Sequence, residues 1–295
     1  MDDLERLETR LDNLRSVRPV LGALRTISLA SWRTALGRRS AIQRYAARLT
    51  DVLAALPEEL RGSEFGASPE ATRHVVMAIG SERGLAGRFS EAVVERADRH
   101  LTQLTSAGDD IELLVLGTRT SRHLQRRNRS PVWEGKLSLT SLPPYRLALE
   151  LASDWLERFR TGELKAVTLV FNDYRGVGQY ATTIRRVLPP QFPTAEGDED
   201  RMSGPPWPPI IETDPVSLYN HVIEQWTAVT VYRTMIDSAV AEHSARYQLM
   251  EGATQNADHL VERLTLDVQN ARKQAITREM QELAAGAGML GQHRS

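Results

Sequence analysis

The sequence predicts an α/β protein in which a long antiparallel coiled coil of the N- and C-terminal helices carries a Rossmann-like α/β domain. Near both ends of the 295-residue chain, apolar side chains recur at three- and four-residue steps, which is typical of long helices. Between them, short apolar runs alternate with helical segments, which is typical of a mostly parallel sheet. We therefore expect a long helix over 1–57, an α/β domain over 73–190, an irregular loop over 191–213 and a second long helix over 214–290.

The C-terminal segment carries the strongest helical pattern. Asp214 and Pro215 are a typical N-cap and first helical residue, and no glycine follows before Gly252. At about 1.5 Å per residue such a helix is on the order of 100 Å long. Because no domain of ordinary size could cover it, we expect it to pack against another long helix, a partner protein, or both. Its apolar stripe includes Ala257, Leu260, Leu264, Val268, Ala271, Ala275, Ile276, Met280, Leu283 and Ala287.

The N-terminal segment carries the matching pattern. The expected seam consists of Leu4, Leu7, Leu11, Leu14, Val17, Leu21, Leu24 and Ile27, and the helical pattern continues to Pro57. Pro19 and Gly22 interrupt it, at costs of about 3 and 1 kcal/mol in a helix. A local excess of arginines follows, which we interpret first as a solvated helix face and second as a contact with an acidic partner: Arg33, Arg38, Arg39, Arg44 and Arg48.

The middle of the chain divides into a linker at 58–72 and the α/β domain. Strands are expected at 74–79, 111–116, 165–171 and 180–188, and helices at 92–104, 119–127 and 145–160. Tyr174–Gly178, between the last two strands, is expected to be a loop.

Composition excludes several classes of function. The chain has no cysteine and a net charge of −1, so disulfides, thiolate chemistry and a general attraction to nucleic acid are not expected. Its histidines are scattered singly and no nucleophile–base pair is recognisable, so we expect no metal, no cofactor and no catalytic residue. No apolar run approaches the roughly 20 residues that span a bilayer, and the acidic N-terminus is unlike a signal peptide. We expect a soluble chain without direct membrane insertion.

A glycine-bearing turn, Ser81-Glu82-Arg83-Gly84-Leu85-Ala86-Gly87, follows the first strand and precedes a helix. Such a turn could hold a phosphate at the helix N-terminus. It lacks the Gly-Lys-Ser/Thr ending of a P-loop and the spacing of a dinucleotide-binding loop. A structural turn is the favoured interpretation.

Both the turn and the C-terminal helix resemble one family. The helix contains Glu242-His243-Ser244-Ala245-Arg246, Ala253-Thr254-Gln255-Asn256-Ala257, Asn270-Ala271-Arg272 and Ile276-Thr277-Arg278-Glu279-Met280. These stretches resemble the C-terminal helix of the gamma subunit of the rotary F-type ATP synthase. The turn is similar to that family's S-D-R-G-L-C-G motif, with Glu82 for Asp and Ala86 for Cys. Pro19, Gly22 and Ser31 replace family lysines, which implies either a bend in the rotor at this point or a divergent branch of the family.

The resemblance implies a non-catalytic rotor in the central stalk of the synthase, which would couple ion flow through the membrane ring to ATP synthesis or hydrolysis. Implied partners are the alpha and beta head subunits, the epsilon subunit and the c-ring, at the cytoplasmic face of a bacterial inner membrane. Ser81, Arg83, Gly84 and Gly87 would form a structural turn. The implied head contacts are Arg272, Thr277, Arg278, Glu279, Glu282, Leu283, Met289 and Leu290.

Two other classes fit the residues alone. One is a coiled-coil adaptor, which genome neighbours encoding head and ring subunits would argue against. The other is a nucleotide-binding α/β protein with a dimerising helical hairpin, which a tightly bound nucleotide in the purified chain would support.

Overall fold

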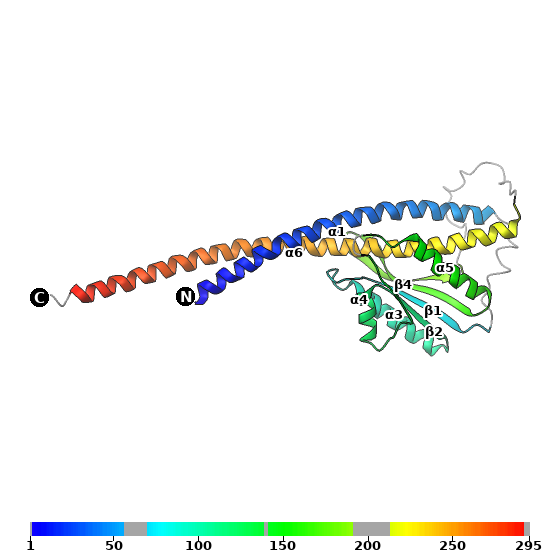
Figure 1. Cartoon of the computed structure of the whole chain (residues 1–295), viewed down its shortest axis with the longest axis horizontal. Coiled ribbons are helices and arrows are strands. Elements are labelled where there is room, and N and C mark those ends of the chain that lie inside the picture. Colours follow the sequence, from blue (N-terminus) through cyan, green and yellow to red (C-terminus); the bar gives the residue numbers. More distant parts are fainter. Residues whose placement is uncertain (1, 56–69, 139–140, 191–212, 292–295) are drawn as a thin grey trace. The chain divides into compact units, whose positions relative to one another are not determined.

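The computed structural model describes residues 2–55, 70–138, 141–190 and 213–291. The predicted linker at 58–72 and the loop at 191–213 lie almost wholly outside these residues. The chain forms two compact units, one of Met1–Ile27 with Tyr247–Ser295 and the other of Ser28–Arg246. Helices α1 (Asp2–Ala55) and α6 (Pro215–Gly291) each contribute to both units (Figure 1). None of the described helices is long and apolar enough to cross a bilayer.

Helix α6 begins where the sequence predicts. The Asp214 carboxylate accepts a 2.8 Å hydrogen bond from the backbone N–H of Ser217, so it caps one of the N–H groups that have no partner within the helix. Pro215 then occupies the first helical position.

The first unit is an antiparallel pair of helices. Leu11, Leu264 and Val268 are buried together, with the partly buried Leu4, Leu7, Leu14 and Val261 around them. Arg18 pairs with Asp258, and Arg25 Nη1 lies 3.1 Å from Glu251 Oε2. A step of seven residues forward along α1 therefore corresponds to a step of seven residues backward along α6, so the two helices are antiparallel. This confirms the predicted antiparallel coiled coil.

The N-terminal seam differs from the prediction after Leu14. Val17 and Ile27 are 48% and 54% exposed, whereas Ser28 is buried. A supercoiled pair keeps strict steps of four and three residues on the facing side, which after Leu14 gives Arg18, Leu21 and Arg25. Arg18, whose side chain is 55% exposed, and Arg25 pair there with carboxylates of α6 instead of filling a buried apolar seam. The apolar residues chosen from the sequence break that alternation, which turns Val17 and Ile27 outward.

The second unit contains a five-stranded sheet in the order β3-β2-β1-β4-β5. Strands β1 (Arg73–Ile79), β2 (Asp110–Leu116), β3 (Trp133–Gly135) and β4 (Leu164–Gly176) run parallel, and β5 (Gln179–Leu188) pairs antiparallel with β4. The mostly parallel sheet was predicted, but the three-residue β3 was not. Tyr174–Gly176 was also wrongly predicted as loop. These residues belong to β4, and the turn is reduced to Val177 and Gly178, whose φ of 66° suits glycine.

Alternate residues of the sheet serve two hydrophobic layers. Val75, Met77 and Ile79 of β1 pack in one cluster with buried residues of α1, α5 (Tyr145–Arg160) and α6. Val76 and Ala78 face the opposite layer, formed with α3 (Phe89–Ser106) and α4 (Thr118–Gln125). This two-residue period explains why α1 and α6 cover one face while α3 and α4 cover the other (Figure 1).

Replacing Leu264 with alanine should destabilise the first unit by about 2–4 kcal/mol, because it leaves a cavity in the small cluster around Leu11. The matched control is Leu266→Ala, since Leu266 is 61% exposed on the same helix and should change stability by about 0.5 kcal/mol or less. Urea unfolding with amide hydrogen exchange over 247–272 measures the difference. Equal effects of the two substitutions would contradict the observed seam.

Candidate functional site

The turn at residues 81–89 lies at the carboxyl ends of β1 and β2, where parallel sheets usually bind ligands. It packs closely against the N-terminus of α4. A Cβ atom at Gly117, where φ is 111°, would lie 2.7 Å from the carbonyl oxygen of Ser81. The buried hydroxyls of Ser81, Ser90 and Thr120 hydrogen-bond to one another, and the backbone N–H of Ser81 donates to Thr120 Oγ1 over 3.1 Å. The turn is thus held rigidly by its own polar contacts.

Glu82 binds the start of α4, not the start of α3, which is the helix that follows the turn. Its carboxylate accepts hydrogen bonds from the backbone N–H of Thr118 (3.1 Å), the Thr118 hydroxyl (2.6 Å) and the backbone N–H of Leu137 (3.0 Å). Burial alone would raise the pKa of Glu82, but these hydrogen bonds outweigh it and hold the pKa below its usual value. The side chain therefore supplies the anion at the start of α4.

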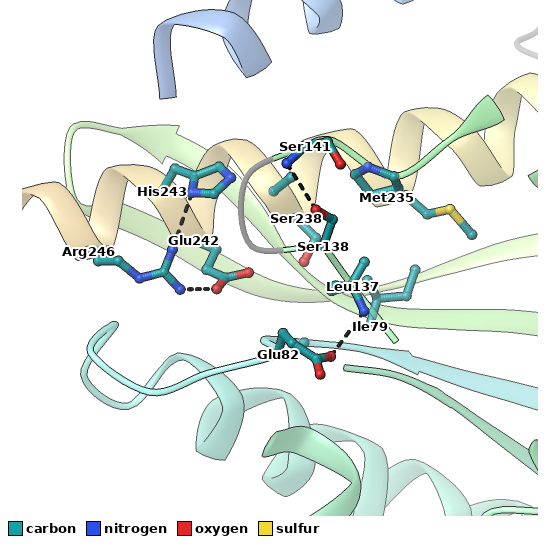
Figure 2. A pocket seen from close by; sticks show the side chains of 13 residues that line it. Ile79, Glu82, Leu137, Ser138, Ser141, Met235, Ser238, Glu242, His243 and Arg246 are labelled. Carbon is teal, nitrogen blue, oxygen red and sulfur yellow. Dashed lines mark hydrogen bonds and ion pairs between the residues drawn. The ribbon is translucent and has the colours of Figure 1, made fainter. Parts of the chain in front are cut away.

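A small pocket separates this turn from α6 (Figure 2). Its walls come from Gly80 and Glu82, from Leu137, Ser138, Ser141 and Pro143, and from the α6 segment between Met235 and Arg246. The volume of about 30 Å³ is enough for one or two water molecules and too small for a nucleotide. Structurally, the pocket brings together the two motifs that resemble the family, Ser81–Gly87 and Glu242–Arg246.

The α6 wall carries a buried ion pair. Arg246 pairs with Glu242, and its Nη1 lies 3.3 Å from His243 Nδ1 (Figure 2). Burial raises the pKa of Glu242 despite the opposing charge of Arg246. Burial, assisted by Arg246, lowers the pKa of His243 to about 4. His243 is therefore neutral near pH 7.

A second polar cluster was missed from the sequence. The carboxylate of Asp237 is 1% exposed and faces three guanidinium groups, from α1, β5 and α6. Arg39 Nε lies 2.7 Å from it, Arg185 donates from both Nη atoms over 3.4 Å, and Arg233 Nε lies at 3.8 Å. Burial lowers the pKa of Arg185, while Asp237 opposes that shift. The sequence feature that could have indicated this cluster is a single aspartate, Asp237, in the largely apolar segment from Met235 to Val240.

The residues expected to contact a head subunit lie along the end of α6. Arg272 pairs with Glu8 of α1, with Nε at 2.9 Å from Glu8 Oε1. Thr277 donates to the Lys273 carbonyl, and Arg278 pairs with Glu282 one turn later. Glu279 is exposed and Leu283 is 69% exposed. The side chains of Met289 and Leu290 lie outside the described residues.

No group of three or more histidine, aspartate or glutamate side chains suited to a metal ion occurs among the described residues. Two histidines, the buried His74 and the partly buried His100, share one hydroxyl instead: His74 Nε2 and His100 Nε2 each lie 3.1 Å from Thr168 Oγ1. Burial, reinforced by the charge of His100, lowers the pKa of His74 to about 4.

Comparison with known proteins matches the chain over almost its whole length. A family model described as ATP synthase matches residues 3–290. The ATP synthase gamma chain of Paracoccus denitrificans is 28% identical, with 98% of this chain and 100% of the relative covered. The ATP synthase gamma chain of an Anaeromyxobacter species is equally identical with the same coverage.

Two solved structures share the fold. One is a chain of the Euglena gracilis mitochondrial ATP synthase, in an assembly described as OSCP/F1/c-ring, with a TM-score of 0.64, 16% identity, and 100% of this chain and 97% of that chain covered. The other belongs to the central stalk/c-ring of the Tetrahymena thermophila mitochondrial ATP synthase, with a TM-score of 0.55, 16% identity, and 79% and 99% covered.

The stability of the second unit should fall as the pH drops from 6.5 towards 4. The folded-state pKa values of His74 and His243, about 4, lie below the ordinary value of 6.5, so in this range the unfolded chain binds protons that the folded chain does not. The raised pKa of Glu242 acts in the opposite sense and is common to all variants compared. Replacing both histidines with glutamine should flatten the pH dependence of the unfolding free energy, measured by urea titration. An unchanged slope would contradict the buried, neutral state of both rings.

Proposed function

The chain belongs to the ATP synthase family, and on that basis we propose that it is the gamma subunit, the rotor of the central stalk. It couples ion flow through the membrane ring to ATP synthesis or hydrolysis in the catalytic head. Its partners are the alpha and beta head subunits, the epsilon subunit and the c-ring. The chain itself is non-catalytic, and it is a peripheral component on the cytoplasmic face of a bacterial inner membrane.

One observation carries this proposal. Within the first unit, α6 continues beyond the part of the helix that α1 covers. Arg272 still pairs with Glu8, but Ile276, Met280 and Leu283 follow at four- and three-residue steps and are 58–69% exposed. An exposed apolar stripe of this kind needs a partner surface.

The charged side chains next to the stripe fit the same role. Arg278, Glu279 and Glu282 are exposed and therefore available to a surrounding subunit. A rotor changes the state of each catalytic site only if it makes different contacts with that site at each angle. A single helix with an apolar stripe on one side and charges on another presents such unequal faces to the subunits around it.

The geometry of the turn disfavours the nucleotide-binding alternative. The pocket beside the turn has a volume of only about 30 Å³, too small for a nucleotide, and the Glu82 carboxylate in its wall would repel a phosphate. We therefore expect no stoichiometric ATP binding by the isolated chain in calorimetry. Binding that substitution of Gly84 or Gly87 abolished would overturn the rotor proposal.

Truncation after Ala275 should abolish or strongly reduce ATP synthesis by the reconstituted complex, because it removes the uncovered stripe. The isolated variant should keep the unfolding transition of the second unit, whose residues all precede the cut. Removing only Gly291–Ser295 is the matched control and should have little effect. Full synthesis by the complex truncated after Ala275 would show that α6 is not the drive shaft.

Charge reversal at Arg278 and Glu279 should change coupled ATP turnover more than the stability of the isolated chain.

A further inference from the structure

Helix α4 presents an unusual concentration of positive charge. No acidic residue stands between Glu112 and Glu134, a stretch that contains five arginines: Arg119, Arg122, Arg126, Arg127 and Arg129. These arginines divide into two sets. Arg127 and Arg129 turn towards α3 and pair with its carboxylates. Arg119, Arg122 and Arg126 are exposed, and within the described part of the chain no side chain forms an ion pair with them.

The three unpaired arginines form one continuous surface. Arg119 and Arg122 lie in α4 and Arg126 is its C-cap residue with helical backbone angles, so spacings of three and four residues place all three on one face. We call this set the α4 arginine face. None of these arginines lines the pocket beside the turn. The Arg119 guanidinium lies beside Gly84 of the turn, 3.5 Å from where a Cβ atom would be.

The neighbouring histidine reports the positive potential of this face. The pKa of His123 is below its ordinary value, first because the ring is partly buried and then because Arg119 and Arg126 lie close to it. The carboxylate of Glu91 opposes the shift, and Arg127 adds to it. The positive charge of the face is thus not neutralised by the acidic residues of α3, which bind Arg88, Arg127 and Arg129.

The arginines of this region that do form ion pairs show which groups can bind the unpaired ones. On α3, Glu91, Glu95 and Asp98 stand at four- and three-residue steps. They receive Arg88 at 3.0 Å, Arg127 at 3.6–3.9 Å and Arg129 at 2.9 Å. An acidic helix face therefore satisfies arginines of this region, and a guanidinium group matches a carboxylate through two parallel hydrogen bonds.

We propose that the α4 arginine face is a docking surface for an acidic helix of another protein, with carboxylates at the spacing of Glu91, Glu95 and Asp98. A membrane surface fits less well, since recognition of anionic lipid generally takes clusters of about four to eight basic residues. The surface is separate from the α6 stripe, and the inference does not rest on the proposed function.

The test uses the full chain and a synthetic alanine-based helix of about 20 residues with glutamates at i, i+4, i+7 and i+11, at low ionic strength. Fluorescence anisotropy of the labelled peptide gives the dissociation constant. The triple variant Arg119→Gln, Arg122→Gln, Arg126→Gln should weaken binding about tenfold, from three exposed ion pairs of roughly half a kcal/mol each. The matched control is Arg6→Gln, Arg15→Gln, Arg146→Gln, which removes the same charge at other exposed positions and should leave binding unchanged.

Two further measurements separate the outcomes. Thermal unfolding of the triple variant should match that of the parent chain, because the three side chains have no partner within its described part. The pKa of His123, followed by NMR, should rise in the triple variant and on peptide binding. Equal loss in the control variant, or equal binding of a peptide with glutamine for glutamate, would overturn the proposal. So would α4-dependent binding to phosphatidylglycerol vesicles or duplex DNA without binding to the acidic peptide.

Discussion

Arginine–carboxylate pairs at heptad spacing are the interaction on which the pairing of α1 and α6 depends. Arg18, Arg25 and Arg39 occupy the heptad position of Leu4 and Leu11, and their partners are Asp258, Glu251 and Asp237. Within the first unit, the seven-residue step from Arg18 to Arg25 matches the seven-residue step back from Asp258 to Glu251, which specifies the antiparallel register. Exposed pairs of this kind contribute only about 0–1 kcal/mol each, so apolar burial supplies most of the stability and the pairs specify the register.

In the second unit the same kind of ion pair matters more for stability, because the carboxylate of Asp237 is buried. Around it α6 is apolar on nearly every side, with Val231, Met235, Ile236 and Val240 all buried between α1 and the sheet. A single carboxylate there faces arginines from α1 and β5 as well as from α6 itself. Burying these charges costs free energy that only close pairing offsets. The cluster therefore makes the docking of both helices onto β5 specific rather than merely hydrophobic.

The sequence allowed the two long helices, the four longer strands and the mostly parallel sheet to be predicted, because each has a clear apolar period. It misled over Val17 and Ile27, which hydrophobicity favoured but which are exposed in the structure, whereas Arg25 is partly buried and Ser28 is buried. The role of Glu82 was not predictable, because it depends on Thr118 and Leu137, which are 36 and 55 residues away. The motif identified the turn in the sequence, but only the folded structure shows that the turn and the Glu242–Arg246 segment line the same pocket.

The two ends of α6 show how one helix serves two environments. Its first half has the all-round apolar surface of a buried core helix, and other parts of the same chain cover that surface. After Arg272 the apolar side chains narrow to a single stripe, and the remaining faces are charged. A stripe of that width suits contact with one surface at a time. The same helix is thus fixed in its own domain at one end and left with unequal, unpaired faces at the other. For a subunit that must present each neighbour in turn with a different surface, this asymmetry is the physical requirement, and no catalytic group is needed to meet it.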